Sequence, residues 1–310
     1  MKKIDYGSVK MLLAIENPMV RKGLLNSLQH EGFQRFEEVA SPESLHSALS
    51  GGDAFDVIVT ATEIAAEFVP PHIARLRQGA FAHHPLPVVI ELLAASDADY
   101  VRKVIDSGPD DLLQLPVSPG QLLSRLAVLA DKRKPFIVTS DYIGPDRRQT
   151  ARPGAAATPT AEMPNPLAMK LEQRSDAAVL EAMTAGAARL RQMRIERYAF
   201  ELQWLLRAIR LLFQAEERDA GRLETFCGRI KTVLGELPKP LPPDAGAIIA
   251  PIAERVALGV AIVAKNGFSA DATVLNGLGG LVNTLTQALH ATLSAEVLEA
   301  AAQARNSAVK

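Results

Sequence analysis

The 310-residue sequence predicts two folds in series: an α/β domain with a doubly wound, five-stranded parallel sheet, followed by an all-helical domain. Short apolar runs alternate with helical patterns up to residue 131, which is typical of a parallel sheet covered by helices. A stretch rich in Pro, Ala and Thr at 153–166 predicts a flexible linker. Beyond it, apolar residues recur every three or four positions without any strand pattern. We therefore expect an α/β domain at 1–134, a basic turn and linker at 135–166, and a helical bundle at 167–310.

Five strands are expected in the α/β domain. The first, at 9–15, is a continuous apolar run, as in a strand buried on both faces of a parallel sheet. The other strands are expected at 33–39, 55–60, 86–92 and 112–115. Because right-handed crossovers bring the carboxyl ends of parallel strands to one edge of the sheet, a functional site is expected along that edge.

Three helices share one start signal, a polar cap followed by proline in the first turn. The signal occurs at Asn17-Pro18, Ser41-Pro42 and Ser118-Pro119, the last of which opens a helix expected at 119–129. Two further helices are expected near 73–77 and at 97–106. Each predicted strand is thus followed by a predicted helix, as the doubly wound fold requires.

The second domain is expected to contain long helices at 167–217, 219–236, 245–265 and 271–305. A proline-rich segment at 238–243 separates two of them, because proline cannot continue a helix. The last two helices are rich in Ala and Gly, which allow close backbone approach. We expect antiparallel helix packing there or a dimer interface.

Composition narrows the class of protein. Apolar residues make up 48% and charged residues 22%, and the net charge of −1 gives no overall attraction to nucleic acid or membrane. The single cysteine, Cys227, allows no internal disulfide and no cysteine metal cluster, as in a reducing cytoplasm. The apolar stretch at 245–264 contains Pro251, Glu254 and Arg255, which make it a poor membrane span. We expect a cytoplasmic protein without a membrane or nucleic-acid partner.

Four segments of the first domain carry a family resemblance. They are LLAIENPMVRKGLLNSLQHEGF, DVIVTATE, PLPVVIELL and VRKVIDSGPDDLLQLPVSPGQLLSRL. In order and spacing they resemble the receiver domain of two-component response regulators over residues 10–131. The resemblance implies a flavodoxin-like fold, a role in bacterial signalling and a cis Leu115–Pro116 bond.

The chemistry of that family needs an acidic pair and an acceptor carboxylate for a divalent cation, with a hydroxyl and a lysine for the phosphoryl oxygens. By the resemblance, these positions are occupied here by Ile15, Glu16, Ala61, Leu92 and Leu115. A one-residue slip brings Leu93, Thr60 or Thr62 to the site, but no nearby slip restores the lysine. The resemblance therefore implies a degenerate phospho-acceptor pocket without a metal or other cofactor.

The basic segment after the receiver-like region allows a second interpretation. Arg148 and Arg152 have the R-x-x-x-R spacing of part of the cyclic di-GMP motif of PilZ domains, and Arg147 lies beside them. Arginine suits such a ligand because its planar fork pairs with phosphate and stacks on guanine. The ordinary alternative is that Gly144-Pro145 makes a turn and that the arginines pair with acids.

Histidines offer two weaker possibilities. His290 lies in a predicted helix, where a histidine phosphotransfer module would place its active residue, although ordinary packing is the simpler interpretation. His83 and His84 are adjacent but have no further metal ligands nearby in the sequence, and we expect them in a solvated loop.

These observations predict a non-enzymatic bacterial signalling protein. Its receiver-like domain would act as a phosphorylation-independent protein-interaction module for other signalling proteins, and its helical domain would form a homo-oligomer. The alternative is a cyclic di-GMP-type nucleotide sensor that uses Arg147, Arg148 and Arg152.

Overall fold

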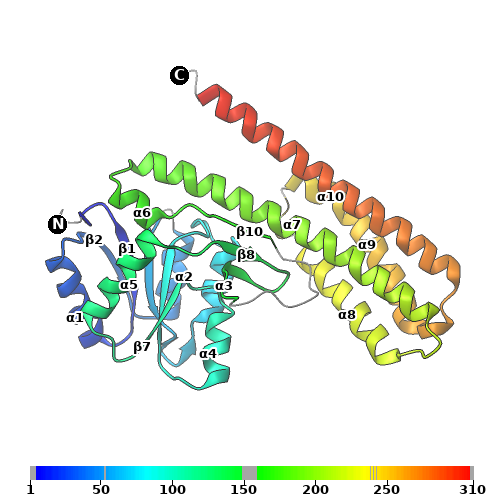
Figure 1. Cartoon of the computed structure of the whole chain (residues 1–310), viewed down its shortest axis with the longest axis horizontal. Helices are drawn as coiled ribbons and strands as arrows, with labels where there is room; N and C mark the ends of the chain where they lie inside the picture. The colour runs from blue at the N-terminus through cyan, green and yellow to red at the C-terminus, as the bar shows by residue number, and fades with distance from the viewer. Residues whose placement is uncertain are drawn as a thin grey trace. The chain divides into compact units, whose positions relative to one another are not determined.

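The computed structural model describes residues 5–51, 54–148, 159–237, 239, 241 and 243–307 (Figure 1). Contacts divide the chain into two compact units, Met1–Leu190 and Arg191–Lys310. The division falls inside the long helix α7 (Asp176–Gln214), so the predicted helical region begins within the first unit.

The first unit is built on a five-stranded sheet with the order β2-β1-β3-β6-β7, in which all neighbours are parallel. This order is that of a doubly wound sheet whose connections switch direction beside the first strand. The predicted fold class is confirmed. The strands are β1 (Lys10–Ala14), β2 (Arg35–Val39), β3 (Val57–Ala61), β6 (Val88–Leu93) and β7 (Asp111–Gln114).

Two layers of helices cover the faces of this sheet. Side chains of α1 and α5 pack with Leu13, Val59 and Ile90 on one face, and those of α2 and α3 pack with Leu12 and Ile58 on the other. Alternation of side chains along each strand produces these two cores. The helices are α1 (Pro18–His30), α2 (Pro42–Ser50), α3 (Pro70–Arg77), α4 (Ala98–Ile105) and α5 (Pro119–Asp131).

The start signals act as the sequence predicted. Asn17 Oδ1 accepts hydrogen bonds from the backbone N–H groups of Met19 and Val20. Ser41 and Ser118 each form a reciprocal capping box with the third residue of the helix. The Leu115–Pro116 peptide bond is cis, as the resemblance implied.

Short strands also lie outside the main sheet, and of these the sequence predicts only a brief strand at 136–139. A hairpin joins β4 (Glu63–Ile64) to β5 (Glu67–Phe68). A second sheet has the order β10-β8-β9, with β8 at Phe136–Val138, β9 at Ile143–Pro145 and β10 at Thr160–Ala161. The expected turn at Gly144-Pro145 is therefore wrong, because both residues pair in β9 with β8.

The predicted single helix at 167–217 is also wrong, because the chain breaks it near Gln173. Helix α6 (Pro166–Leu171) ends there, and Gln173 has a φ of 61° before α7 begins. Leu167 of α6 is fully buried in the core beneath α1 and α5. The start of the predicted helical region thus completes the core of the α/β unit.

The second unit packs the C-terminal part of α7 with α8 (Ala220–Glu236), α9 (Pro243–Asn266) and α10 (Ala272–Ser307). A short 3₁₀ helix, η1 (Gly267–Ser269), connects α9 to α10, and these two helices lie side by side (Figure 1). The core shared by α7, α8, α9 and α10 contains Ile209, Cys227, Val260 and Leu285, one residue from each helix. The proline-rich break is followed by a new helix, as predicted.

One helical stretch in the described part of the chain, Asp244–Ser269, is long and apolar enough to cross a membrane by length and composition. Its most apolar window has a mean hydropathy of 2.0, and only 22% of that window is buried. A single such helix is weak evidence for a membrane span, because core helices of other proteins pass the same test.

Candidate functional site

The carboxyl edge of the main sheet brings together the positions that the resemblance assigned to a phosphoryl pocket. Ala61 pairs with Leu92 across β3 and β6, and Ile15 follows the end of β1. Ile15, Ala61 and Leu92 are buried, while Leu115 packs partly buried against the same core as Ile15. Four of the five positions are therefore aliphatic where the family's chemistry needs carboxylate, hydroxyl and ammonium groups.

Glu16, the one acidic side chain among the five positions, holds a backbone loop. Its Oε2 accepts a 2.7 Å hydrogen bond from the N–H of Ala65, in the β4–β5 hairpin. Ala65 and Ala66 have positive φ values of 50° and 61°, a conformation that costs free energy for alanine and needs support from its surroundings. The Glu16 carboxylate provides part of that support.

Arg21 binds the backbone at the end of β1. Its Nη1 donates to the carbonyl oxygens of Ile15 and Glu16, and its Nε donates to Glu38 Oε2 at 3.0 Å. The guanidinium thus joins the end of β1 to β2. The sequence analysis missed this contact, since Arg21 lies at the start of a helical pattern and Glu38 is 17 positions away.

Thr62, the alternative acceptor position after a one-residue slip, is also engaged. Its Oγ1 donates to the Leu92 carbonyl at 3.0 Å and accepts from the N–H of Ala94 at 3.1 Å. The hydroxyl of Tyr100 lies 2.7 Å from Thr62 Oγ1 and 3.1 Å from Glu63 Oε1. These bonds tie the ends of β3 and β6 to α4. Within the described residues, no three or more His, Cys, Asp or Glu side chains are grouped so that they could hold a metal ion.

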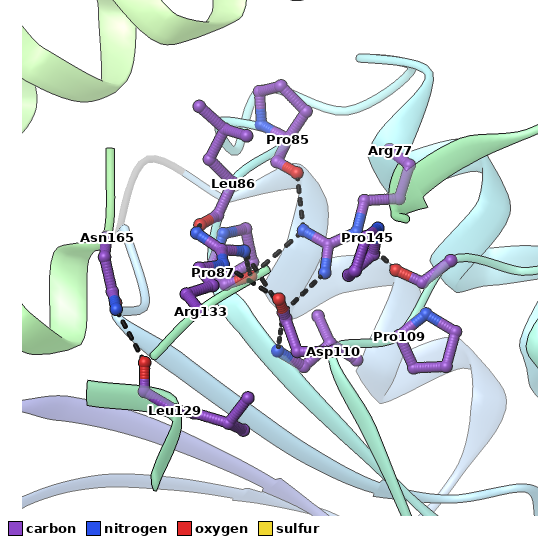
Figure 2. Close-up of polar contacts among 12 residues, drawn as sticks. Arg77, Pro85, Leu86, Pro87, Pro109, Asp110, Leu129, Arg133, Pro145 and Asn165 are labelled. Atoms are coloured by element: carbon purple, nitrogen blue, oxygen red, sulfur yellow. Dashed lines mark hydrogen bonds and ion pairs between the residues drawn. The ribbon is translucent and has the colours of Figure 1, made fainter. Parts of the chain in front are cut away.

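The opposite, amino-terminal edge of the sheet contains a buried charge network that the sequence analysis missed (Figure 2). Asp110 Oδ2 accepts from Arg77 Nη2 at 2.9 Å and from the Val89 N–H at 2.8 Å, and Asp110 Oδ1 accepts from Arg133 Nε at 2.8 Å. The side chains of Arg77 and Asp110 are fully buried, and that of Arg133 is 5% exposed. Burial alone would raise the pKa of Asp110, but Arg133 and Arg77 hold it below its usual value.

The remaining donors of the two arginines bind backbone carbonyls at the starts of the strands. Arg77 donates to Pro85 and Pro87, and Arg133 donates to Leu86 and Pro87 (Figure 2). Arg77 also donates to the Gly108 carbonyl, and Arg133 to the Pro164 carbonyl. Phe136 of β8 packs against both guanidinium groups, and its ring centroid lies 5.2 Å from Arg77 Cζ and 4.8 Å from Arg133 Cζ. The network, which we call the Asp110 network (Arg77, Asp110 and Arg133), joins α3, β6, β7 and the segment after α5.

Two of the three arginines that were candidates for a nucleotide site lie in the described part of the chain, and they contact different groups. Arg147 Nη2 donates to the Pro109 carbonyl at 2.8 Å, beside the start of β7. Arg148 instead pairs with Asp146, with Nη2 to Oδ2 at 2.7 Å, and hydrogen bonds from Arg148 lower the pKa of Asp146. Arg152 lies outside the described residues. A shared ligand site for the three arginines stays a prediction.

Buried ionisable groups also lie between the two edges. Glu91 in β6 is fully buried; its Oε2 accepts from Ser107 Oγ at 3.1 Å, while its Oε1 has no hydrogen-bond partner among the described residues. Burial raises the pKa of Glu91 to about 8. The group is therefore protonated near neutral pH.

The expectation that His83 and His84 lie in a solvated loop is wrong for His83. This ring is 3% exposed, stacks on Phe55 and accepts a 2.6 Å hydrogen bond from the Phe55 N–H. Burial lowers the pKa of His83 to about 4, so the ring is neutral at physiological pH. His290 lies on the exposed side of α10.

Comparison with solved structures finds proteins of the response-regulator class. The response regulator DrrB of Thermotoga maritima, an OmpR/PhoB homologue, is 22% identical over 42% of this chain and 56% of its own, with a TM-score of 0.36. The BeF3-activated DrrB receiver domain is 22% identical over 40% of this chain and 98% of its own, with a TM-score of 0.35. A CheY-like receiver domain protein of Methanospirillum hungatei is 15% identical over 41% and 97%, with a TM-score of 0.36.

The chain thus spans about half the length of full-length DrrB. No family model matches the sequence, and no curated protein matches it. The strand order and the parallel register give residues 10–131 the flavodoxin-like doubly wound fold that the sequence predicted, which is the fold of receiver domains.

Proposed function

We propose that the receiver-fold domain is a phosphorylation-independent, non-enzymatic protein-interaction module in bacterial two-component signalling. The observation that carries this proposal is the apolar carboxyl edge, where Ala61 stands at the acceptor position and the Glu16 carboxylate is bonded to the Ala65 N–H. The acceptor position at the end of β3 carries a methyl group, and the carboxylate two residues on, Glu63, accepts a hydrogen bond from Tyr100, which supports the proposal.

Aspartyl phosphorylation needs several polar groups to act together. A hard divalent cation requires a set of oxygen ligands, and the transferred phosphoryl group requires cations or hydroxyls around its oxygens. Leu92 and Leu115 supply neither, and the Glu16 carboxylate by itself gives Mg²⁺ too few oxygen ligands. The same apolar side chains add to the core, so they favour one fixed conformation of this edge.

A fixed conformation suits a module that works by binding. A surface that needs no switching loses less conformational entropy when a partner docks. Regulation would then come from the presence of the partner or from the helical unit, and other signalling proteins are the expected partners.

Phosphorylation competence is tested by incubating the full-length chain with acetyl phosphate and Mg²⁺ and measuring its intact mass. We expect no phosphoryl adduct, while an authentic receiver treated in parallel gains one. Calorimetric melting with and without Mg²⁺ is the second measurement, because the only tryptophan, Trp204, lies in the helical unit and cannot report on this edge. A stoichiometric adduct would overturn the proposal.

Glu16→Gln is the matched variant for the metal part of this test. Glutamine keeps an oxygen for the Ala65 N–H but loses the charge that a cation needs. We expect wild type and variant to respond alike to millimolar Mg²⁺. A Mg²⁺-dependent rise in melting temperature that only the wild type gives would contradict the proposal.

A further inference from the structure

Helix α9 presents an unpaired apolar seam on the side facing away from its core. Along it, exposed positions alternate at spacings of four and three residues, and they are Asp244, Ile248, Pro251, Arg255, Leu258, Ile262 and Lys265. We call these residues the α9 seam. Such spacing is that of a coiled-coil contact line, where side chains three and four apart form one continuous stripe.

The seam is a different surface from the one that holds the bundle together. Ile249, Val256, Val260 and Val263, on the inner side of α9, are buried in the core of the helical unit. On the seam, Ile248 is 68% exposed, Leu258 66% and Ile262 44%. Contiguous exposed apolar side chains of this size mark an interaction surface more often than an ordinary solvated face.

The order of charges along the seam specifies what fits it. Asp244 stands at its start and Lys265 at its end, while Glu254 and Arg255 are adjacent at its middle. Within the part of the chain that the structure describes, none of these four side chains forms an ion pair. The charges are therefore available to a partner.

A second copy of α9 laid antiparallel about a twofold axis at Arg255 complements the charged ends of the seam and its apolar positions. Asp244 then faces Lys265 of the second copy. The two Arg255 side chains meet at the axis, where Glu254, the preceding residue on each copy, supplies a carboxylate beside them. The apolar positions match in the same register, with Ile248 against Ile262 and Pro251 against Leu258. A parallel pair would instead place like charges together, which is destabilising.

We propose that two copies of this chain associate through the α9 seam as an antiparallel, twofold-symmetric helix pair. The symmetry is that of an isologous dimer, in which one patch is complementary to itself. A lipid occupant fits less well, because Glu254 and Arg255 lie in the middle of the apolar stripe and charges are costly in a bilayer core. The proposal concerns the helical unit alone, so it is independent of the phosphorylation state of the receiver fold.

The first test is the oligomeric state of the full-length chain by sedimentation velocity. We expect a concentration-dependent dimer for the wild type and, since central interface residues dominate binding energy, at least about a tenfold weaker dimer for Leu258→Ser. Leu211→Ser, which removes an exposed leucine of α7, is the matched control and should leave the dimer unchanged. A wild-type monomer at all concentrations would overturn the proposal.

Disulfide trapping tests the orientation directly. Arg255→Cys lies at the twofold axis and should cross-link to itself, whereas Ile248→Cys alone should not, because its copy is about 20 Å away at a rise of 1.5 Å per residue. A mixture of Ile248→Cys and Ile262→Cys chains should cross-link. The wild type is the blank, since Cys227 is buried. Self-cross-linking of Ile248→Cys as fast as that of Arg255→Cys would rule out the antiparallel pair.

Charge exchange distinguishes pairing between chains from a helix-dipole effect. Asp244→Lys alone and Lys265→Asp alone should each weaken the dimer, and the double variant should restore it. An effect on the helix dipole alone predicts the opposite, because the double exchange puts unfavourable charges at both ends of α9. If the double variant dimerises no better than the single ones, or if the wild-type chain binds neutral phosphatidylcholine vesicles as a monomer, the proposal is wrong.

Discussion

The two edges of the receiver-fold sheet differ in where they keep their charge. At the carboxyl edge, Ala61 and Leu92 extend the apolar core, and Glu16 is bonded to a hairpin backbone. At the amino edge, Asp110 is buried between Arg77 and Arg133. The difference is that the buried ion pairs among the described residues of this domain lie at the end of the sheet opposite to the predicted phosphoryl pocket.

The amino edge uses its charges to attach the segments that come after the receiver fold in the chain. Arg133 reaches the Pro164 carbonyl, Phe136 of β8 covers both guanidinium groups, and Asn165 donates to the Leu129 carbonyl. A buried ion pair by itself contributes little net stability, because desolvation offsets the attraction, but removing one partner leaves an uncompensated charge. The Asp110 network is therefore expected to hold β8 and the segment around Pro164 in one arrangement against the amino edge of the sheet.

Removing the charge of Asp110 should have the largest effect on this comparison. Asp110→Ala leaves two buried guanidinium groups without their carboxylate, and we expect a loss of about 3–5 kcal/mol in the free energy of unfolding. Asp111→Ala is the matched control, since its half-exposed partner Arg125 stays solvated and the loss should be below about 1 kcal/mol. Urea denaturation of both variants measures the difference. Equal losses would show that the network has no special role.

Placing a carboxylate at the carboxyl edge tests the other half of the comparison. Ala61→Asp buries an acid without the cation set that would compensate it, so we expect a loss of about 2–3 kcal/mol at pH 7 and no acetyl-phosphate adduct. Ala61→Asn is the control for size. The loss for Ala61→Asp should shrink toward that of Ala61→Asn as the pH falls and the new acid is protonated. A phosphorylated Ala61→Asp chain would show that the rest of the pocket is intact.

Glu91, between the two edges, should make the stability of the domain depend on pH. Its pKa is raised by burial to about 8, so its proton is held more tightly in the folded chain than in the unfolded one. The stabilising contribution is complete below the unfolded pKa and is lost as the pH rises through about 8.

Glu91→Gln should remove this dependence. We expect the variant to be more stable than the wild type by at least about 1 kcal/mol at pH 8.5, with the difference vanishing near pH 5. Denaturation at the two pH values measures it, and Glu63→Gln, at an exposed position, is the control. A variant that is less stable at both pH values would mean that Glu91 is charged and paired in the folded chain.

Local signals made the sheet and the carboxyl edge predictable. Caps such as Ser41 and Ser118 fix where helices begin, and the apolar register of the strands brings Ala61 beside Leu92. The Asp110 network was not predictable in the same way, because Arg77 and Asp110 are 33 positions apart and meet only after the sheet has formed. The break at Gln173 was missed because a positive φ there has no glycine to announce it.

The smallest expected changes in unfolding free energy distinguish Arg147 from Arg148, the two described arginines that follow β9. Arg147→Ala removes a hydrogen bond from a half-buried guanidinium to the Pro109 carbonyl and should cost about 1 kcal/mol. Arg148→Ala breaks an exposed pair with Asp146 and should change the unfolding free energy by less than Arg147→Ala does.

Calorimetric titration with cyclic di-GMP completes this comparison and tests the alternative function. If Arg147 is an anchor of the amino edge, the wild-type chain gives only the heat of dilution, and the stability difference between the two variants is the only effect. Saturable binding to the wild type that both Arg147→Ala and Arg148→Ala abolish would instead make the tail a nucleotide site. In that case the nucleotide would bind at the amino edge of the sheet, where Arg147 contacts Pro109 and the guanidinium groups of Arg77 and Arg133 are buried.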